Sequence, residues 1–189
     1  MSVVVAVKEN GVVYMGADSQ ITIERDKEIK HTLNDSSFKI RKLNNGILVG
    51  HCGDVQSAER IFSNQDILTL DENGMLTKKH IVTNIVPKLL EIIDEIGDKK
   101  KGIIDVTLIL AYKESLYKIE DDLVTYKYNN YVKSGTGGAF VDYPLYLYRD
   151  LPIKERIVKA LQESARRDLY VSAPFVLINT KEQKYEIVD

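Results

Sequence analysis

The sequence begins with MSVVVAVKENGVVYMGADSQ, residues 1–20, whose pattern of apolar and turn residues is the first indication of the fold. Two runs rich in valine, residues 3–7 and 12–15, flank an Asn-Gly pair at 10–11. Two β-branched runs separated by Asn-Gly predict a β-hairpin. The first predicted strand starts directly after Ser2, and we expect no leader peptide before it.

Ser2 carries the candidate chemistry of this hairpin. A methionine before a small residue is commonly removed, and loss of Met1 would give Ser2 a free α-amine beside its hydroxyl. An α-amine has an ordinary pKa of about 7.7–8.0, so it is a suitable general base for that hydroxyl at neutral pH. A second-position serine is far more often a plain structural residue, so the assignment depends on the rest of the chain.

The remaining predicted elements follow the order strands, two helices, strands, two helices, strands. Helices are predicted over 55–63, 78–96, 139–148 and 153–167, and strands over 47–49, 103–112, 116–119, 123–128, 174–179 and 185–188. Residues 24–37 lack a clear period and are expected to form a long surface connection. The order predicts two sheets packed face to face with helices outside, which is a four-layer αββα sandwich of the α+β class. Residues 1–189 are expected to form a single domain.

The composition excludes several classes of function. A net charge of −2 gives no indication of a nucleic-acid or anionic-membrane partner. Cys52 is the one cysteine, so the chain forms no internal disulfide and no cysteine-based zinc site, as is typical of the cytoplasm. No apolar run is long enough to span a membrane. The three histidines lack a metal-ligand spacing and are expected to face solvent, and we expect no metal or other cofactor.

Four short motifs occur in a specific order along the chain. They are Gly16-Ala17-Asp18-Ser19, Phe38-Lys39-Ile40, Leu48-Val49-Gly50-His51-Cys52-Gly53-Asp54-Val55-Gln56 and Ser134-Gly135-Thr136-Gly137-Gly138. In this order and register the chain resembles the β-type subunits of the proteasome and the bacterial protease HslV, which are N-terminal-nucleophile hydrolases. The resemblance covers nearly the whole chain and is strongest over residues 2–56.

The resemblance implies a role for each of several residues. Ser2 takes the nucleophile position, where most members of the family have threonine. Asp18 and Lys39 match the charged pair beside the nucleophile. Gly50 matches the glycine whose N–H stabilises the oxyanion.

Two further positions are implied near the chain start. Thr136 matches a residue that hydrogen-bonds the terminal amine, and Asp168 matches an aspartate that organises the N-terminus. The accessory serine of the family falls on Val171 without a gap and on Ser172 with a one-residue insertion, and the sequence leaves both open.

Substrate contacts are implied at the mouth of the site. Ser19 and Thr22 match the strand along which an extended substrate pairs as an added strand. Leu48 and Cys52 match positions around the first specificity pocket, which is therefore expected to be mainly apolar.

The function implied is a cytoplasmic N-terminal-serine peptidase that acts on peptides or unfolded proteins. The family assembles its subunits into rings and pairs them with an AAA+ unfoldase, so self-association is expected. Two alternatives stay open, which are a small-amide hydrolase of the same fold and a catalytically silent ring subunit. Each residue also has a structural explanation: Lys39 as a solvated side chain, Gly50 as a close-packing site and Cys52 as a small buried thiol.

Overall fold

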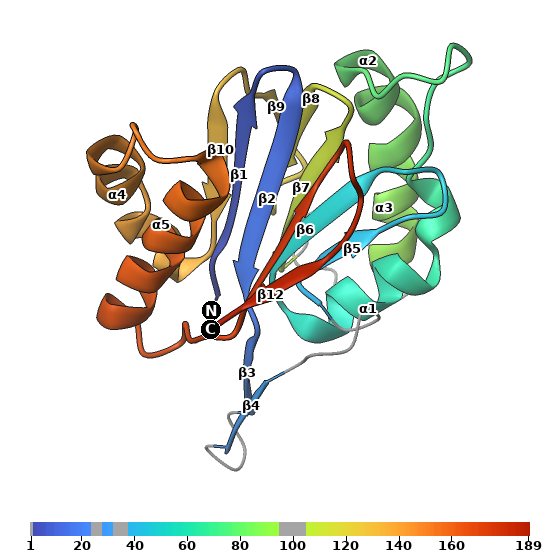
Figure 1. Ribbon diagram of the computed structural model, residues 1–189. Helices are drawn as coiled ribbons and strands as arrows, with labels where there is room; N and C mark the ends of the chain where they lie inside the picture. Colours follow the sequence, from blue (N-terminus) through green and yellow to red (C-terminus); the bar gives the residue numbers. More distant parts are fainter. Residues whose placement is uncertain (1, 24–27, 32–37, 95–104) are drawn as a thin grey trace.

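The computed structural model describes residues 2–23, 28–31, 38–94 and 105–189 (Figure 1). Within these residues the strands form two five-stranded antiparallel sheets and one two-stranded ladder. No helix among them is both long and apolar enough to cross a membrane.

The first sheet is built around the N-terminal hairpin, in the order β10-β1-β2-β11-β12. Its strands are β1 (Val4–Glu9), β2 (Val12–Asp18), β10 (Tyr131–Ser134), β11 (Phe175–Asn179) and β12 (Glu186–Val188). Asn10 and Gly11 form the two-residue turn with φ angles of 50° and 75°. Two positive φ angles define the turn type that Asn-Gly favours in tight hairpins. The predicted hairpin is therefore confirmed.

The second sheet has the order β5-β6-β7-β8-β9. Its strands are β5 (Ile40–Lys42), β6 (Leu48–Gly53), β7 (Val106–Tyr112), β8 (Ser115–Ile119) and β9 (Thr125–Lys127). A separate ladder pairs β3 (Gln20–Ile23) with β4 (Glu28–His31). The predicted surface connection over 24–37 therefore contains a strand, and its other residues, 24–27 and 32–37, lie outside the described residues.

The helices occur in two groups, one for each sheet. They are α1 (Val55–Ser63), η1 (Gln65–Ile67), α2 (Lys78–His80), η2 (Ile81–Ile85) and α3 (Val86–Asp94), then η3 (Thr136–Phe140), α4 (Asp142–Leu147) and α5 (Ile153–Arg167). The helix predicted over 78–96 is interrupted by the π-helical turn η2, just before Pro87. Proline lacks the N–H needed for a regular helix, which accounts for the irregularity there.

Three apolar clusters fill the spaces between four layers (Figure 1). One cluster lies between the two sheets and includes Met15 and Leu48. A second packs α5 on the first sheet through Leu161, and a third packs α1 and α3 on the second sheet through Ile61 and Leu89. The predicted αββα sandwich is thus the observed architecture.

Candidate active site

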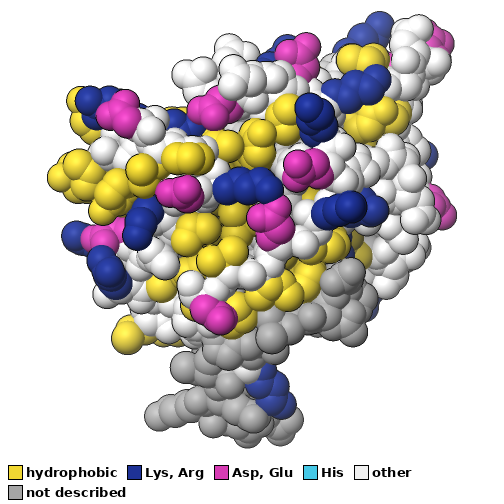
Figure 2. Space-filling view, viewed as in Figure 1, with side chains coloured by type: hydrophobic (Ala, Val, Ile, Leu, Met, Phe, Trp, Pro, Cys, Tyr) yellow, Lys and Arg dark blue, Asp and Glu magenta, His cyan; other side chains and the backbone are white. Residues whose placement is uncertain are grey.

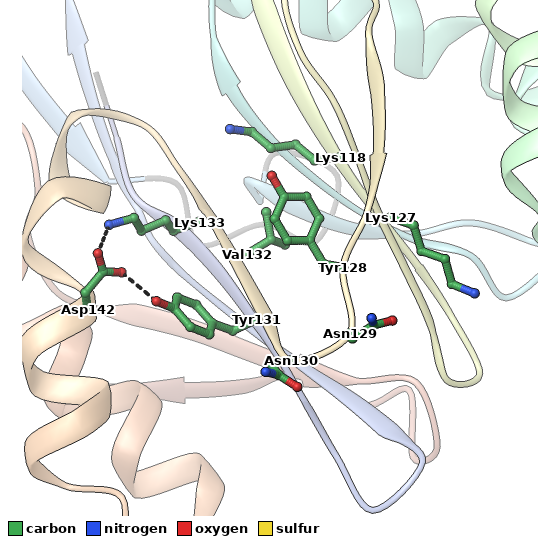
Figure 3. Close-up of a pocket in the computed structure, with 9 residues that line it drawn as sticks. All are labelled: Lys118, Lys127, Tyr128, Asn129, Asn130, Tyr131, Val132, Lys133 and Asp142. Carbon is green, nitrogen blue, oxygen red and sulfur yellow. Dashed lines mark hydrogen bonds and ion pairs between the residues drawn. The ribbon is translucent and has the colours of Figure 1, made fainter.

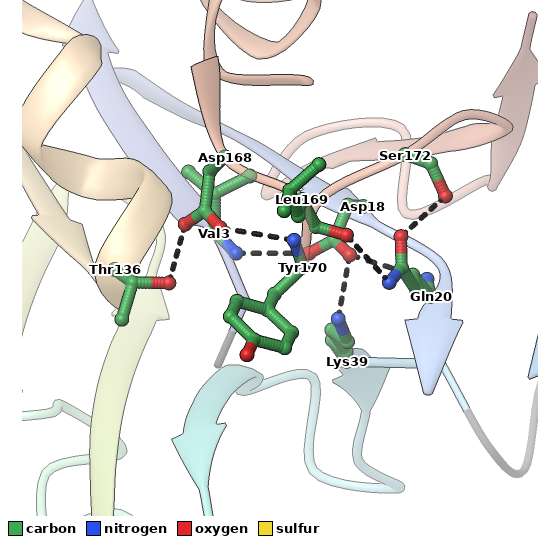
Figure 4. A network of polar contacts seen from close by, with 9 residues as sticks. All are labelled: Val3, Asp18, Gln20, Lys39, Thr136, Asp168, Leu169, Tyr170 and Ser172. Carbon is green, nitrogen blue, oxygen red and sulfur yellow. Dashed lines mark hydrogen bonds and ion pairs between the residues drawn. The ribbon is translucent and has the colours of Figure 1, made fainter. Parts of the chain in front are cut away.

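Asp18, the last residue of β2, lies at the centre of a polar network next to the N-terminal residues (Figure 4). Its Oδ1 accepts the N–H of Val3 at 2.8 Å. Its Oδ2 accepts one hydrogen bond from the Lys39 ammonium at 2.7 Å and another from the N–H of Gln20 at 3.1 Å. Asp18 is fully buried and Lys39 is 6% exposed. Two residues predicted from separate motifs therefore meet beside the residue that follows Ser2.

Burial and pairing act in opposite directions on Asp18. Desolvation raises the pKa of its carboxyl above the ordinary value, because burial disfavours the charged form. The Lys39 charge and the N–H donors of Val3 and Gln20 oppose that rise. The ammonium of Lys39 is thus bound to a buried carboxylate. Strand alternation alone suggested that Lys39 would be a solvated side chain.

The glycines of the 134–138 motif hold the backbone of Ser2. Ser2 is 5% exposed, and its carbonyl accepts the N–H of Gly137 at 3.1 Å. Gly135 has a φ of 84°, and a Cβ atom there would lie 2.1 Å from the Ser2 carbonyl oxygen. Only glycine allows this close approach with that backbone conformation. The motif fixes the start of β1, which is a positioning function for the predicted nucleophile.

Thr136 and Asp168 form a second pair near the chain start (Figure 4). The Thr136 hydroxyl donates to Asp168 Oδ2, and Oδ1 of the same carboxylate accepts the N–H of Tyr170 at 2.9 Å. Asp168 stands at the C-terminal end of α5. The structure therefore joins Thr136 to Asp168 directly. The contact between Thr136 and the terminal amine, which the resemblance implies, stays a prediction.

Val171 and Ser172, the two candidates for the accessory serine position, have different surroundings in the structure. Val171 is buried, and its side chain lies close to Gly137. Ser172 donates its hydroxyl to Gln20 Oε1 at 2.7 Å. Gln20 is a site-region residue that the sequence analysis did not select, although it directly follows the Gly-Ala-Asp-Ser motif.

The geometry argues against the oxyanion role predicted for Gly50. The N–H of His51 donates to the Lys39 carbonyl on the β5 side at 2.9 Å. Neighbouring N–H groups of a strand point to opposite sides, so that of Gly50 faces β7, where Ile109 is its partner. The N–H of Gly50 therefore points toward the neighbouring strand β7 and away from a substrate.

Close packing explains why a glycine stands at this position. A Cβ atom on Gly50 would lie 2.7 Å from Val4 Cγ1 and 2.9 Å from Met15 Cε. The missing side chain thus lets the two sheets approach each other, which is the structural explanation open at the sequence level.

The four predicted substrate residues differ in their access to solvent. Leu48 is fully buried in the cluster between the sheets, which argues against a direct substrate contact. Ser19 is 1% exposed, between β2 and β3. Thr22 pairs with Ile29 in the β3–β4 ladder, and its side chain lies outside the described part of the chain.

Cys52 lines a cavity of about 420 Å³, where β6 and β10 end and β7 begins. The remaining lining residues are Gly53, Asp105, Val106, Thr107, Asp121, Ser134, Gly135 and Thr136. Burial raises the pKa of the Cys52 thiol to about 11, so the thiol stays protonated at neutral pH and is no candidate nucleophile. The cavity adjoins Gly135, which contacts Ser2. Cys52 therefore lies close enough to Ser2 for the substrate-binding role predicted for it, and that role stays a proposal.

His51 differs from its expected solvent-facing position. It is 9% exposed, its ring packs edge-on against Phe62 of α1, and burial lowers its pKa to about 3. Its Nε2 has no hydrogen-bond partner among the described residues. His51 is a neutral core residue.

A second cavity, of about 490 Å³, lies on the β8–β10 side of the molecule (Figure 3). Three lysines line it, but Lys118 pairs with Glu120 and Lys133 pairs with Asp142, so most of its positive charge is neutralised. The predicted site residues do not line this cavity.

No protein-family model and no curated protein matches the sequence. Solved structures do match the fold. BPH from Thiobacillus denitrificans superposes with a TM-score of 0.70 at 11% identity, covering 94% of this chain and 96% of that one. Eukaryotic HslV from Trypanosoma brucei gives a TM-score of 0.66 at 15% identity, with 94% and 98% covered. The Anbu (Gly-1) mutant from Hyphomicrobium sp. strain MC1 gives 0.73 at 10% identity, with 100% and 87% covered.

At such low identities the superpositions show the fold alone. The expected resemblance is confirmed at that level: the chain has the αββα fold of HslV and of the ancestral proteasome β-subunit Anbu.

Proposed function

We propose that this chain is a proteasome-type N-terminal-nucleophile hydrolase that uses Ser2 after removal of Met1. One observation carries the proposal: the buried Asp18–Lys39 pair is hydrogen-bonded to the backbone of Val3, directly after Ser2. A buried ion pair stabilises a fold no better than well-packed apolar residues of similar volume. Its location at the chain start is therefore better explained by chemistry than by stability.

The reaction proposed is acyl transfer to Ser2. The α-amine of Ser2 accepts the proton of the Ser2 hydroxyl, Oγ attacks a peptide carbonyl, and the amine returns the proton to the leaving amine. Water then hydrolyses the acyl-enzyme. The positive charge of Lys39 lowers the free energy of the developing alkoxide and holds down the pKa of the nearby amine. The mechanism assigns no step to Gly50.

A covalent probe and intact-mass spectrometry test this proposal. Thiobacillus denitrificans BPH, which shares the fold at 12% identity, has been solved in complex with epoxomicin, and the same compound is a suitable probe here. We expect a mass without Met1 and one epoxomicin adduct. Ser2→Ala should take up no adduct, whereas the exposed Ser63→Ala on α1 should be labelled as the wild type is. Retained Met1 together with no adduct would favour a silent subunit.

The serine itself gives a second test. Threonine at position 2 would add a γ-methyl, which restricts the side-chain rotamer. We expect Ser2→Thr to hydrolyse peptides at least as fast as the wild type. A much slower Ser2→Thr enzyme would contradict the idea that the missing γ-methyl leaves the side chain of Ser2 less well oriented.

Self-association is the second part of the proposal, with another copy of this chain as the partner and an AAA+ unfoldase as a possible supplier of unfolded substrate. The proposed site of action is the cytoplasm. Hydrophobic side chains gather over α4 (Figure 2), where Tyr143 is 68%, Tyr146 66% and Leu147 48% exposed. Exposed apolar groups of this kind mark interaction surfaces.

Light scattering tests the assembly. We expect an oligomer that Tyr143→Lys weakens. A monomer that hydrolyses small amides and leaves peptides intact would favour the small-amide hydrolase.

A further inference from the structure

We infer that Gln20 is a positioning residue that holds the Asp168 loop, residues 168–172, against the Asp18–Lys39 pair. The kinetic part of this inference rests on the proposed function. The structural part stands on the hydrogen bonds of Gln20 alone.

Gln20 bonds to both halves of the site at once (Figure 4). Its backbone N–H donates to Asp18 Oδ2 at 3.1 Å. Its side chain turns to the loop, where Nε2 donates to the Leu169 carbonyl at 3.0 Å and Oε1 accepts the Ser172 hydroxyl at 2.7 Å. Gln20 itself is 3% exposed, and its two side-chain bonds are partly buried.

The loop has few apolar anchors of its own. Leu169 is 89% exposed and Tyr170 is 38% exposed, whereas Val171 is 2% exposed. The N–H groups of Tyr170 and Val171 both bond to Asp168, so these bonds shape the loop without attaching it to β3. The amide of Gln20 supplies that attachment.

Loop position matters because of what Asp168 holds. Asp168 accepts the Thr136 hydroxyl, and the glycines on either side of Thr136 contact the Ser2 carbonyl. A displaced loop would move Asp168, then the 135–137 backbone, and with it Ser2. Gln20 therefore couples the order of the Asp168 loop to the position of the proposed nucleophile.

The amide group is chemically matched to this task. It must donate to a carbonyl and accept from a hydroxyl, and Gln offers both functions. A glutamate has only acceptors when ionised, so Gln20→Glu would place a carboxylate oxygen against the Leu169 carbonyl. Gln20→Met keeps the length and loses both hydrogen bonds.

Hydrogen exchange measured by mass spectrometry on peptides covering 168–172 tests the structural part. We expect the loop amides to exchange roughly tenfold faster in Gln20→Met and Gln20→Glu than in the wild type. Gln183→Met is the matched control, because Gln183 Nε2 donates to the Gly46 carbonyl at 3.1 Å. Gln183 belongs to the turn between β11 and β12, and Figure 1 shows that turn at the end of these strands away from the N-terminus. Gln183→Met should leave loop exchange unchanged. Wild-type exchange in both Gln20 variants would overturn the inference.

Peptide hydrolysis tests the positioning role. A displaced nucleophile affects the transition state more than substrate binding, so kcat should fall about tenfold in Gln20→Met with KM within about twofold. Ser172→Ala, which removes one of the two side-chain bonds, should show a smaller fall in kcat. Faster loop exchange with an unchanged kcat would refute positioning. Faster loop exchange in a protein whose wild type neither hydrolyses peptides nor takes up epoxomicin would leave the structural link intact and reject the proposed function.

Discussion

The two polar pairs beside Ser2 differ in environment. Asp18 and Lys39 have side chains 0% and 7% exposed, while Thr136 and Asp168 lie near the surface. A buried charge that loses its partner keeps its desolvation cost, whereas an exposed group is resolvated by water. Loss of either partner of the Asp18–Lys39 pair is therefore expected to affect folding as well as the proposed chemistry. Thr136–Asp168 can change with little effect on stability.

The largest effect is expected from breaking the buried pair. Lys39→Met leaves Asp18 buried without a counter-ion and should lower the free energy of unfolding by about 3–5 kcal/mol, measured by denaturant titration. Without Lys39, the folded protein favours the protonated form of Asp18. The pKa of Asp18 in the folded variant therefore lies further above its value in the unfolded chain. Stability of the variant should therefore fall as pH rises from 5 to 8.

Two comparisons control for the loss of a lysine. Lys154 pairs with Glu186 on the surface, and Lys154→Met should cost less than about 1 kcal/mol. The double variant Asp18→Asn/Lys39→Met should recover part of the loss. Equal costs for Lys39→Met and Lys154→Met would contradict the distinction between buried and exposed pairs.

A substitution at Gly135 should be next in size. Alanine there combines a positive φ with a Cβ that overlaps the Ser2 carbonyl, and we expect a loss of roughly 2–4 kcal/mol in thermal or denaturant unfolding. Gly74 has a φ of 66° with open space around it, so Gly74→Ala isolates the backbone cost at about 1 kcal/mol. The contact with Ser2 would be unimportant if the two variants unfolded alike.

The smallest effect on stability is expected at the exposed pair. Thr136→Val removes the hydrogen bond to Asp168 and should change the free energy of unfolding by about 1 kcal/mol or less. Thr136→Val should lower kcat by more than its small effect on stability would suggest, because the pair belongs to the proposed site. A loss as large as that of Lys39→Met would show that exposure does not separate the two pairs.

Much of the fold and part of the site could be predicted from the sequence, each on its own grounds. The Asn10-Gly11 turn was predictable because turn chemistry acts within a few residues. The order of strands and helices was predictable from apolar periods, which report which face of each element is buried. The partnership of Asp18 and Lys39 came from the ordered motifs of a known family.

The errors share a cause. The direction of the Gly50 amide depends on the register of β6 between β5 and β7, and a shift of one residue reverses it. His51 becomes a core residue because α1 places Phe62 against it. No periodicity in the sequence reports either contact.

The N-terminal hairpin, the layered architecture and the candidate residues for acyl-transfer chemistry could be read from the sequence, because these follow from local propensity and residue type. The bond from Thr136 to Asp168, the close packing at Gly50 and the link that Gln20 makes between the two halves of the site became visible in the folded structure alone. Those outcomes depend on strand register and on contacts between residues up to 152 positions apart, as between Gln20 and Ser172. Such contacts form only when the layers pack. The first twenty residues contain the proposed nucleophile, and the packed fold supplies its surroundings.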